Sequence, residues 1–251
     1  MINLTSEELQ RYKRLKTSDE HHNNNGTIYI DEDKKIIYKL IDTEYFFPDE
    51  TSRNIDYQIN NPIPNTPVIL DKLSIDGKYS GYVMTYIENS ISFRDALSKQ
   101  IPEEKRIKAI IDIYKTLRYL HSNNITLGDI HMDNFLINED GGYIIDLDYM
   151  RFPGDEFKFQ TCYDVIANNK KHTRSNKYTD SLKVMVVSLS LLIGRDLEKL
   201  IKGSELRLED ILSTISNPSL LEYINKSIST EEPLYFDEYL KEQISKNIKI
   251  W

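Results

Sequence analysis

Residues 120–149 carry most of the structural and chemical information in this chain: LHSNNITLGDIHMDNFLINEDGGYIIDLDY. Two apolar runs, Phe135–Ile137 and Tyr143–Ile145, flank a turn rich in Asn, Asp and Gly. This pattern predicts a tight β-hairpin. Asn134 precedes the first strand and Asp146 follows the second, so the hairpin is expected to bring these two residues close together.

The polar residues around this hairpin suit a cation-binding site. Asp and Asn oxygens that converge beside a cleft are typical ligands of a hard cation such as Mg²⁺. We therefore expect Asn134 and Asp146 to bind a metal ion. Asp129, one loop earlier, is placed to orient an attacking hydroxyl or to accept its proton.

The segments before this stretch are predicted to be rich in strands. A Thr5–Glu8 capping box, with Leu9, Tyr12 and Leu15 at helical spacing, predicts a first helix. Runs of β-branched residues and Tyr predict two β-hairpins, and Pro48 is expected to open a helix between them. The predicted elements are GTIYI with KKIIYKLI (26–30 and 34–41), the helix 48–59, and PVILDKLSI with GKYSGYVMTYI (67–75 and 77–87).

The remainder of the chain is predicted to be mainly helical, over residues 90–99, 102–122 and 180–193. The last of these is apolar on most faces and is expected to be buried. The fold class is therefore α+β, with a small β-rich lobe at 1–87 containing one main helix and a larger helical lobe at 88–251. Such an organisation suggests a ligand cleft between the lobes.

Composition narrows the classes of partner. The 251 residues carry 32 basic and 40 acidic side chains, a net charge of −8, which disfavours a nucleic-acid partner. The sequence has no run of about 18 apolar residues, so no membrane partner is expected. The N-terminus lacks the apolar core of a signal peptide and Cys162 is the single cysteine, so a cytoplasmic location is expected.

The spacing D-x-x-x-x-N, followed by an apolar strand ending in I-D, resembles the catalytic loop and metal-binding motif of protein-kinase-like phosphotransferases. The resemblance implies a two-lobed kinase-like fold that uses ATP and Mg²⁺. It implies that Asp129 is the catalytic aspartate and that Asn134 and Asp146 are the metal ligands. The acceptor implied is a hydroxyl group.

The resemblance extends into the first lobe. Lys39 in Ile-Ile-Tyr-Lys resembles the strand lysine that binds the nucleotide phosphates, and Glu50 in the next helix is the best candidate for its ion-pair partner. The run Val-Met-Thr-Tyr-Ile-Glu resembles a kinase hinge with Met84 as gatekeeper. It implies that the backbones of Thr85 and Ile87 bind adenine.

Several residues depart from the protein-kinase pattern. Leu-Gly-Asp replaces His-Arg-Asp, so we expect no switch that reads a phosphorylated activation loop. His131 makes the motif G-D-x-H-x-x-N, as in aminoglycoside- and choline-kinase-like enzymes; it is either a catalytic group or a hydrogen-bonding residue of the loop. Asp148 is either a ligand of a second metal or a solvated carboxylate. Gly26 is the one glycine available for a phosphate-covering loop, and Asp180 resembles the buried aspartate that steadies the catalytic loop.

Two acceptor classes remain open at this point, a protein Ser/Thr, slightly favoured, and a small-molecule hydroxyl. His131 and Asp148 favour the small molecule, whereas the Asp180 helix favours a protein acceptor. The thin glycine loop and the missing His-Arg-Asp also leave open a nucleotide-binding pseudokinase, or an enzyme that donates AMP instead of phosphate.

Overall fold

The computed structural model describes residues 1–15, 27–41, 48–155, 176–202, 215–230 and 232–246. The chain is of the α+β class and divides into two compact units. One unit comprises Met1–Ser90 and the short segment Leu147–Tyr149; the other comprises Ile91–Asp146 and Met150–Trp251. The sequence predicts a boundary after Ile87, three residues before the observed boundary after Ser90. The return of the chain to the first unit at residues 147–149 was not predicted from the sequence.

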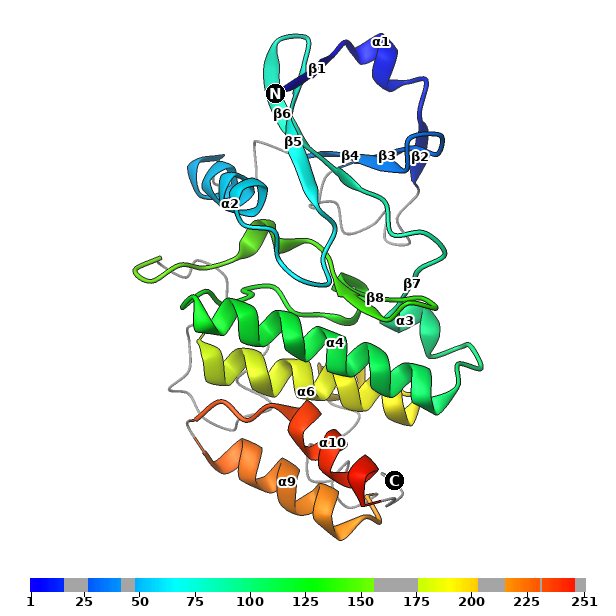
Figure 1. The fold of residues 1–251 in the computed structure, drawn as a ribbon, viewed down its shortest axis with the longest axis vertical. Coiled ribbons are helices and arrows are strands. Elements are labelled where there is room, and N and C mark those ends of the chain that lie inside the picture. The colour runs from blue at the N-terminus through cyan, green and yellow to red at the C-terminus, as the bar shows by residue number, and fades with distance from the viewer. Residues whose placement is uncertain (16–26, 42–47, 156–175, 203–214, 231, 247–251) are drawn as a thin grey trace. The chain divides into compact units, whose positions relative to one another are not determined.

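The first unit is built on a six-stranded mixed sheet in the order β1-β5-β6-β4-β3-β2 (Figure 1). β1 is parallel to β5, and the other neighbouring strands are antiparallel. The strands are β1 Ile2–Leu4, β2 Lys13–Leu15, β3 Ile28–Asp31, β4 Ile36–Leu40, β5 Ile69–Ile75 and β6 Lys78–Thr85.

Both predicted hairpins of this unit, β3–β4 and β5–β6, are confirmed. The second turns at Asp76 and Gly77, whose φ angles are 49° and 79°. A two-residue hairpin turn of this type needs positive φ at both central residues, and Asp-Gly is one of the pairs that tolerate it best. The turn chemistry in the sequence therefore decides the pairing of β5 with β6.

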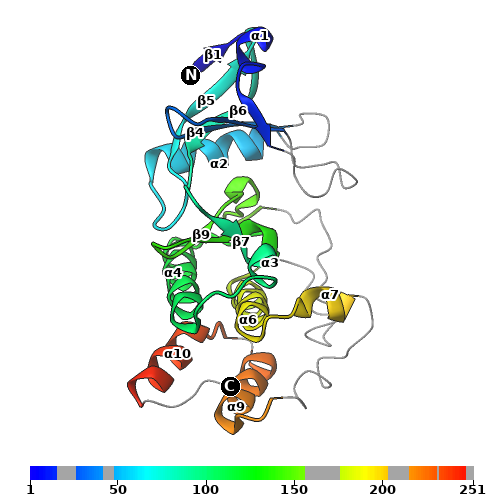
Figure 2. The ribbon, with the colours of Figure 1, turned by 90° about the vertical axis from the view of Figure 1, so that its right-hand side faces the viewer.

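The predicted helix after Pro48 is confirmed as α2, Pro48–Asn60, and it contacts β5 on one face of the sheet (Figure 2). Its fully buried Ile55 joins a core cluster with residues from the sheet, Ile41, Ile69, Tyr82 and Met84. Burial of these side chains fixes α2 against the strands that carry the candidate nucleotide-binding residues.

The helix predicted from Thr5 to Leu15 is wrong beyond its first turn. The capping box is present, but α1 spans only Ser6–Leu9, and residues 13–15 form β2, which pairs with β3. Leu9 is nevertheless buried and Tyr12 stacks on Tyr38. The apolar spacing thus marked side chains that face the core, while pairing with the neighbouring hairpin, a contact invisible to local propensity, determined the backbone.

The second unit combines a three-stranded sheet, ordered β7-β8-β9, with helices; α4 and α6 lie side by side (Figures 1 and 2). α6 is buried from Tyr178 to Leu192, as its apolar sequence predicts. The elements are β7 Ile91–Ser92, α3 Phe93–Ala96, α4 Glu103–Ser122, β8 Phe135–Ile137, β9 Gly142–Ile144, α6 Lys177–Ile193, α7 Leu197–Lys202, α9 Pro218–Ser229 and α10 Phe236–Ser245.

The helix predicted over residues 90–99 is also shorter than expected. Ile91 and Ser92 form β7, which pairs with β8, and α3 keeps only one turn, Phe93–Ala96. Ser92 both ends the strand and caps the helix, because its hydroxyl accepts a hydrogen bond from the Asp95 amide at 3.0 Å. The strand–helix junction fixes the position of Arg94, two residues after the cap.

Among the described residues, no helix combines the length and the apolar character needed to cross a membrane. Cys162 and Gly26 lie outside the described residues.

Candidate functional site

The side chain of Asp180 holds the loop that precedes Asp129 in place through a hydrogen bond. The side chain of Asp180 is 1% exposed, and its Oδ2 accepts a hydrogen bond from the Leu127 amide at 2.7 Å. The same oxygen lies 3.3 Å from Nε2 of His121, near the end of α4. Gly128 then takes a φ of 80°, which glycine adopts without steric cost. The predicted contact between the α6 aspartate and this loop is therefore present in the structure.

Asp129 and Asn134 are in direct contact. The Nδ2 group of Asn134 donates to Oδ2 of Asp129 at 3.4 Å and to its backbone carbonyl at 3.5 Å. A short 3₁₀ turn, η1 (Met132–Asn134), closes the loop through a bond from the Asn134 amide to the His131 carbonyl. Because Nδ2 faces Asp129, Oδ1 of Asn134 points away from it, and no described residue donates to Oδ1.

The predicted β8–β9 hairpin is confirmed, and it holds Asp146 next to Asn134 along the backbone. The amide of Ile145 donates to the Asn134 carbonyl at 2.9 Å, so the two ends of the hairpin meet. Asp146 follows with a φ of 65°, in the left-handed region that few non-glycine residues occupy. Backbone conformations of this kind concentrate at functional sites, where the surrounding structure enforces them.

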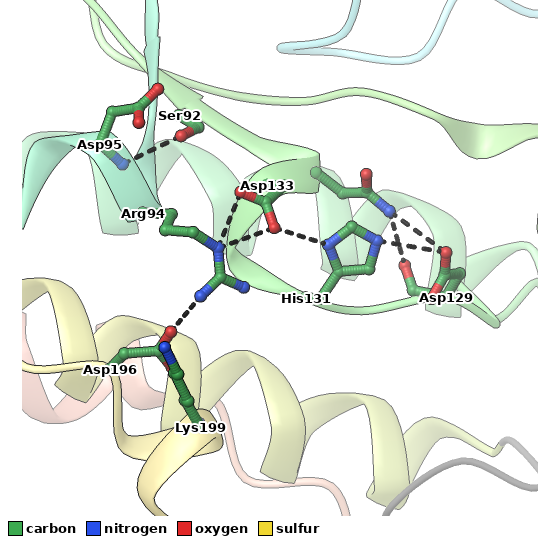
Figure 3. A network of polar contacts seen from close by, with 9 residues as sticks. Ser92, Arg94, Asp95, Asp129, His131, Asp133, Asp196 and Lys199 are labelled. Atoms are coloured by element: carbon green, nitrogen blue, oxygen red, sulfur yellow. Dashed lines mark hydrogen bonds and ion pairs between the residues drawn. The ribbon is translucent and has the colours of Figure 1, made fainter. Parts of the chain in front are cut away.

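His131 lies between two carboxylates (Figure 3). Its Nε2 is 3.4 Å from Oδ2 of Asp129, and its Nδ1 is 3.5 Å from Oδ2 of Asp133. Burial alone would lower the pKa of His131, but the two carboxylates outweigh it and raise this pKa to about 10. The ring is therefore an imidazolium at neutral pH.

The same contacts keep Asp129 ionised. Burial would raise the pKa of Asp129, but His131, Lys183 and the amide of Asn134 together hold this pKa below its ordinary value. The pKa of Asp133 is likewise lowered, since His131 and Arg94 outweigh the effect of burial. The loop thus presents a carboxylate that stays charged through the physiological pH range.

In the first unit, Lys39 on β4 is buried and forms an ion pair with Asp148. Lys39 Nζ lies 2.7 Å from Oδ2 of Asp148, and the other oxygen accepts a hydrogen bond from Tyr82 at 2.5 Å. The side chain of Asn54, on α2, donates to the Asp148 carbonyl at 2.6 Å. Asp148 is 3% exposed, so the expectation of a solvated carboxylate is wrong. These contacts occupy both of its side-chain oxygens.

The other expected nucleotide-binding residues lie on or beside the same sheet. Glu50 is in the first turn of α2, where its pairing with Lys39 stays a prediction. Met84 is buried beneath α2 in the core cluster. The Thr85 amide donates to the Val68 carbonyl at 3.0 Å and its hydroxyl accepts from the Val68 amide, whereas the Ile87 carbonyl accepts from Ser90. Adenine binding by Thr85 and Ile87 stays a prediction.

The oxygen donors at the end of the hairpin fit a magnesium ion. Asn134 offers an amide oxygen with no described donor, and Asp146 offers a carboxylate, the two ligand types that hard cations prefer. No group of three or more His, Cys, Asp or Glu side chains gathers as a metal cage in the described part of the chain. A two-ligand protein site of this kind suits Mg²⁺ held jointly with phosphate oxygens.

Four residues that shape these contacts were not expected from the sequence. Asp133 carries a local signal, because acids two residues on either side of His131 are placed to flank its ring. Asn54 belongs to a buried polar stripe of α2, with Thr51 and Gln58. Tyr82 and Arg94 carry no local signal, since their partners lie 66 and 39 residues away.

The second unit thus contains an ionised aspartate bonded to an asparagine, on a loop that a buried aspartate holds in place. Carboxylate and amide oxygens of this kind are groups that hydroxyls and hard cations bind. No protein-family model and no curated protein matches the sequence of this chain.

Proposed function

We propose that this protein is an ATP- and Mg²⁺-dependent phosphotransferase of protein-kinase-like fold, which transfers the γ-phosphoryl group to a hydroxyl. The observation that carries the proposal is the contact set of Asp129: Asn134 bonds to its carboxylate, and Asp180 fixes the loop that carries it. These contacts support the proposal because they join two residues of the motif in the sequence, Asp129 and Asn134. The confirmed hairpin that ends at Asp146 adds the third member of the motif.

Asp129 is proposed to orient the acceptor hydroxyl and to receive its proton. The hydroxyl oxygen forms a bond to the γ-phosphorus while the bond from that phosphorus to the β,γ-bridging oxygen breaks, which releases ADP. Because the pKa of Asp129 is lowered, the carboxylate is a weak base and takes the proton late, once the new bond has largely formed. This timing suits the loose transition state of phosphoryl transfer, in which positioning contributes most of the rate enhancement.

Asn134 and Asp146 are proposed to hold the magnesium ion, which when bound neutralises negative charge on the phosphates. The amide of Asn134 would then serve both partners, with Nδ2 on Asp129 and Oδ1 toward the cation. The left-handed φ of Asp146 sets the direction of its carboxylate relative to the hairpin.

Lys39 is proposed to bind the nucleotide phosphates, with Asp148 as the residue that orients it. An ammonium group carries three N–H donors, and the bond to Asp148 uses one of them. A second-metal role for Asp148 would compete with its bonds to Lys39 and Tyr82, so we favour the orienting role. Met84, Thr85 and Ile87 are proposed to contact the adenine.

The first experiment is transfer of label from γ-labelled ATP in the presence of Mg²⁺, with a fractionated cell lysate as the source of acceptors. Label in protein bands would identify a protein Ser/Thr kinase, and label in the small-molecule fraction a metabolite or antibiotic kinase. Asp129→Asn and Asp146→Asn are expected to abolish transfer and to leave the fold intact.

Asp140→Asn is the matched control, because Asp140 is an exposed aspartate in the turn of the same hairpin. It should keep full activity. Full transfer by both site variants would overturn the assignment. Transfer from α-labelled ATP alone would replace it with AMP donation, and ATP binding without any transfer would replace it with a nucleotide-binding module.

A further inference from the structure

Five charged residues alternate in sign from the candidate catalytic loop to the segment between α6 and α7 (Figure 3). His131 bridges Asp129 and Asp133, as described above. Arg94 continues the series: its Nε lies 2.8 and 2.9 Å from the two oxygens of Asp133, and its Nη1 contacts Asp196. Each negative group in this series is thus followed by a positive one.

At the other end of this series, backbone hydrogen bonds hold the short elements that carry Arg94 and follow Asp196. Arg94 lies in the single turn of α3, whose start is capped by Ser92 and whose preceding strand pairs with β8. Asp196 precedes α7, and its Oδ1 accepts a hydrogen bond from the Lys199 amide at 2.9 Å. The guanidinium is therefore held between the turn of α3 that carries it and the residue that precedes α7.

At the Asp129 end of the series, the contacts distinguish the two carboxylate oxygens of Asp129. Oδ2 is the oxygen that faces both His131 and the Nδ2 group of Asn134. Among the described residues, none donates to Oδ1. A carboxylate held through one oxygen cannot rotate about its Cβ–Cγ bond without losing both contacts, so Oδ1 keeps one direction.

We propose that Arg94 is a positioning residue of the phosphotransferase, acting through Asp133 and His131 to hold Asp129 so that Oδ1 receives the acceptor hydroxyl. This inference rests on the proposed function and adds to it the oxygen that receives the proton and the residues that aim it. Without Arg94, the half-exposed carboxylate of Asp133 is released toward water. The His131 ring then loses one of its two anchors, and Oδ2 of Asp129 loses a firmly held donor.

The test uses Arg94→Gln, with Arg118→Gln as its matched control. Arg118 is equally exposed, 35% against 37%, and also binds two carboxylates, those of Asp237 and Glu238. We expect Arg94→Gln to lower kcat by about 10- to 100-fold, the usual effect of misplacing a reacting group by about 1 Å. The KM for ATP and the urea midpoint should stay unchanged, and Arg118→Gln should leave kcat unchanged.

Two further variants separate positioning from a general structural role. Arg94→Lys keeps a cation beside Asp133 and should recover most of kcat. The double variant Arg94→Gln/Asp133→Asn should be no slower than Asp133→Asn, because both substitutions break the same series. Unchanged kcat in Arg94→Gln, or multiplicative effects in the double variant, would overturn the proposal.

Crystal structures of the wild type and Arg94→Gln, both without nucleotide, supply a readout that needs no activity. The contact between Asp129 Oδ2 and Asn134 Nδ2 should be kept in the wild type and lost in the variant. If the wild type transfers no phosphate, the proposed function fails. A displaced Asp129 in the variant would still support the role of Arg94, and an unmoved one would refute it.

Discussion

Replacing Asp180 with alanine should destabilise the second unit and release the loop that carries Asp129. The Leu127 amide, in a residue that is 2% exposed, would lose its acceptor, and an orphaned buried amide costs about 1–3 kcal/mol. Asp180 also lies in the first turn of α6, where a negative charge contributes about 0.3–1 kcal/mol. We therefore expect the free energy of unfolding to fall by about 2–4 kcal/mol.

Ser181→Ala is the matched control for this experiment. Ser181 is the next residue of the same helix and is equally buried, but its hydroxyl has no hydrogen-bond partner among the described residues. Removing an unsatisfied buried hydroxyl relieves a desolvation cost, so this variant should be neutral or slightly stabilised. The contrast isolates the hydrogen bonds of Asp180 from the loss of side-chain volume in the helix.

Urea denaturation followed by circular dichroism measures both variants. With a slope of about 3 kcal/mol per M, the Asp180→Ala midpoint should fall by about 1 M. Hydrogen exchange at the Leu127 amide should accelerate in Asp180→Ala and stay unchanged in Ser181→Ala. Equal midpoints for the two variants, together with a protected Leu127 amide in both, would refute the anchoring role of Asp180.

Three further predictions concern single contacts. Asp148→Ala removes the carboxylate beside buried Lys39 and should cost about 3–5 kcal/mol in urea denaturation, a loss that replacing both residues with apolar ones should largely reverse. The stability that protonated His131 contributes is complete below its unfolded pKa of 6.5 and is lost as pH rises through about 10, so the midpoint difference between wild type and His131→Gln should shrink from pH 7 to pH 10. Gly142→Ala would place a Cβ 2.2 Å from the Ala109 carbonyl oxygen, so it should destabilise the fold by about 1–3 kcal/mol and lower the thermal midpoint. An unchanged midpoint would mean that α4 and the hairpin move apart at no cost.

The elements that the sequence predicted correctly are those specified by short-range chemistry. Asp76-Gly77 demands one turn type, Pro48 opens a helix, and the apolar run of α6 matches its burial. The first helix failed because the backbone of residues 13–15 obtains its hydrogen bonds from β3. The apolar spacing of the first helix nevertheless marked side chains that face the core. Strand pairing with a distant segment overrode the helical periodicity of the backbone.

In the candidate site, too, contacts between residues close in the sequence were predictable and contacts between distant residues were not. Asp129, Asn134 and Asp146 are separated by a loop and one hairpin, so their spacing in the sequence carries their geometry. Lys39 and Asp148 are individually visible in the sequence, yet their pairing depends on a contact 109 residues apart. The contacts of Arg94 could not be predicted from the sequence, because a single arginine in a one-turn helix is typical of any protein surface.

The excursion of Leu147–Tyr149 into the first unit has a consequence for how this protein is made. A ribosome synthesises residues 1–90 well before it reaches Asp148, so the six-stranded sheet emerges with Lys39 still lacking the carboxylate that it contacts in the finished fold. Long-range closures of this kind are slow relative to local hairpins and helices. The contact between Lys39 and Asp148 therefore forms only after residues 147–149 have been translated, and a chain cut after Ser90 would contain all six strands without the Asp148 carboxylate.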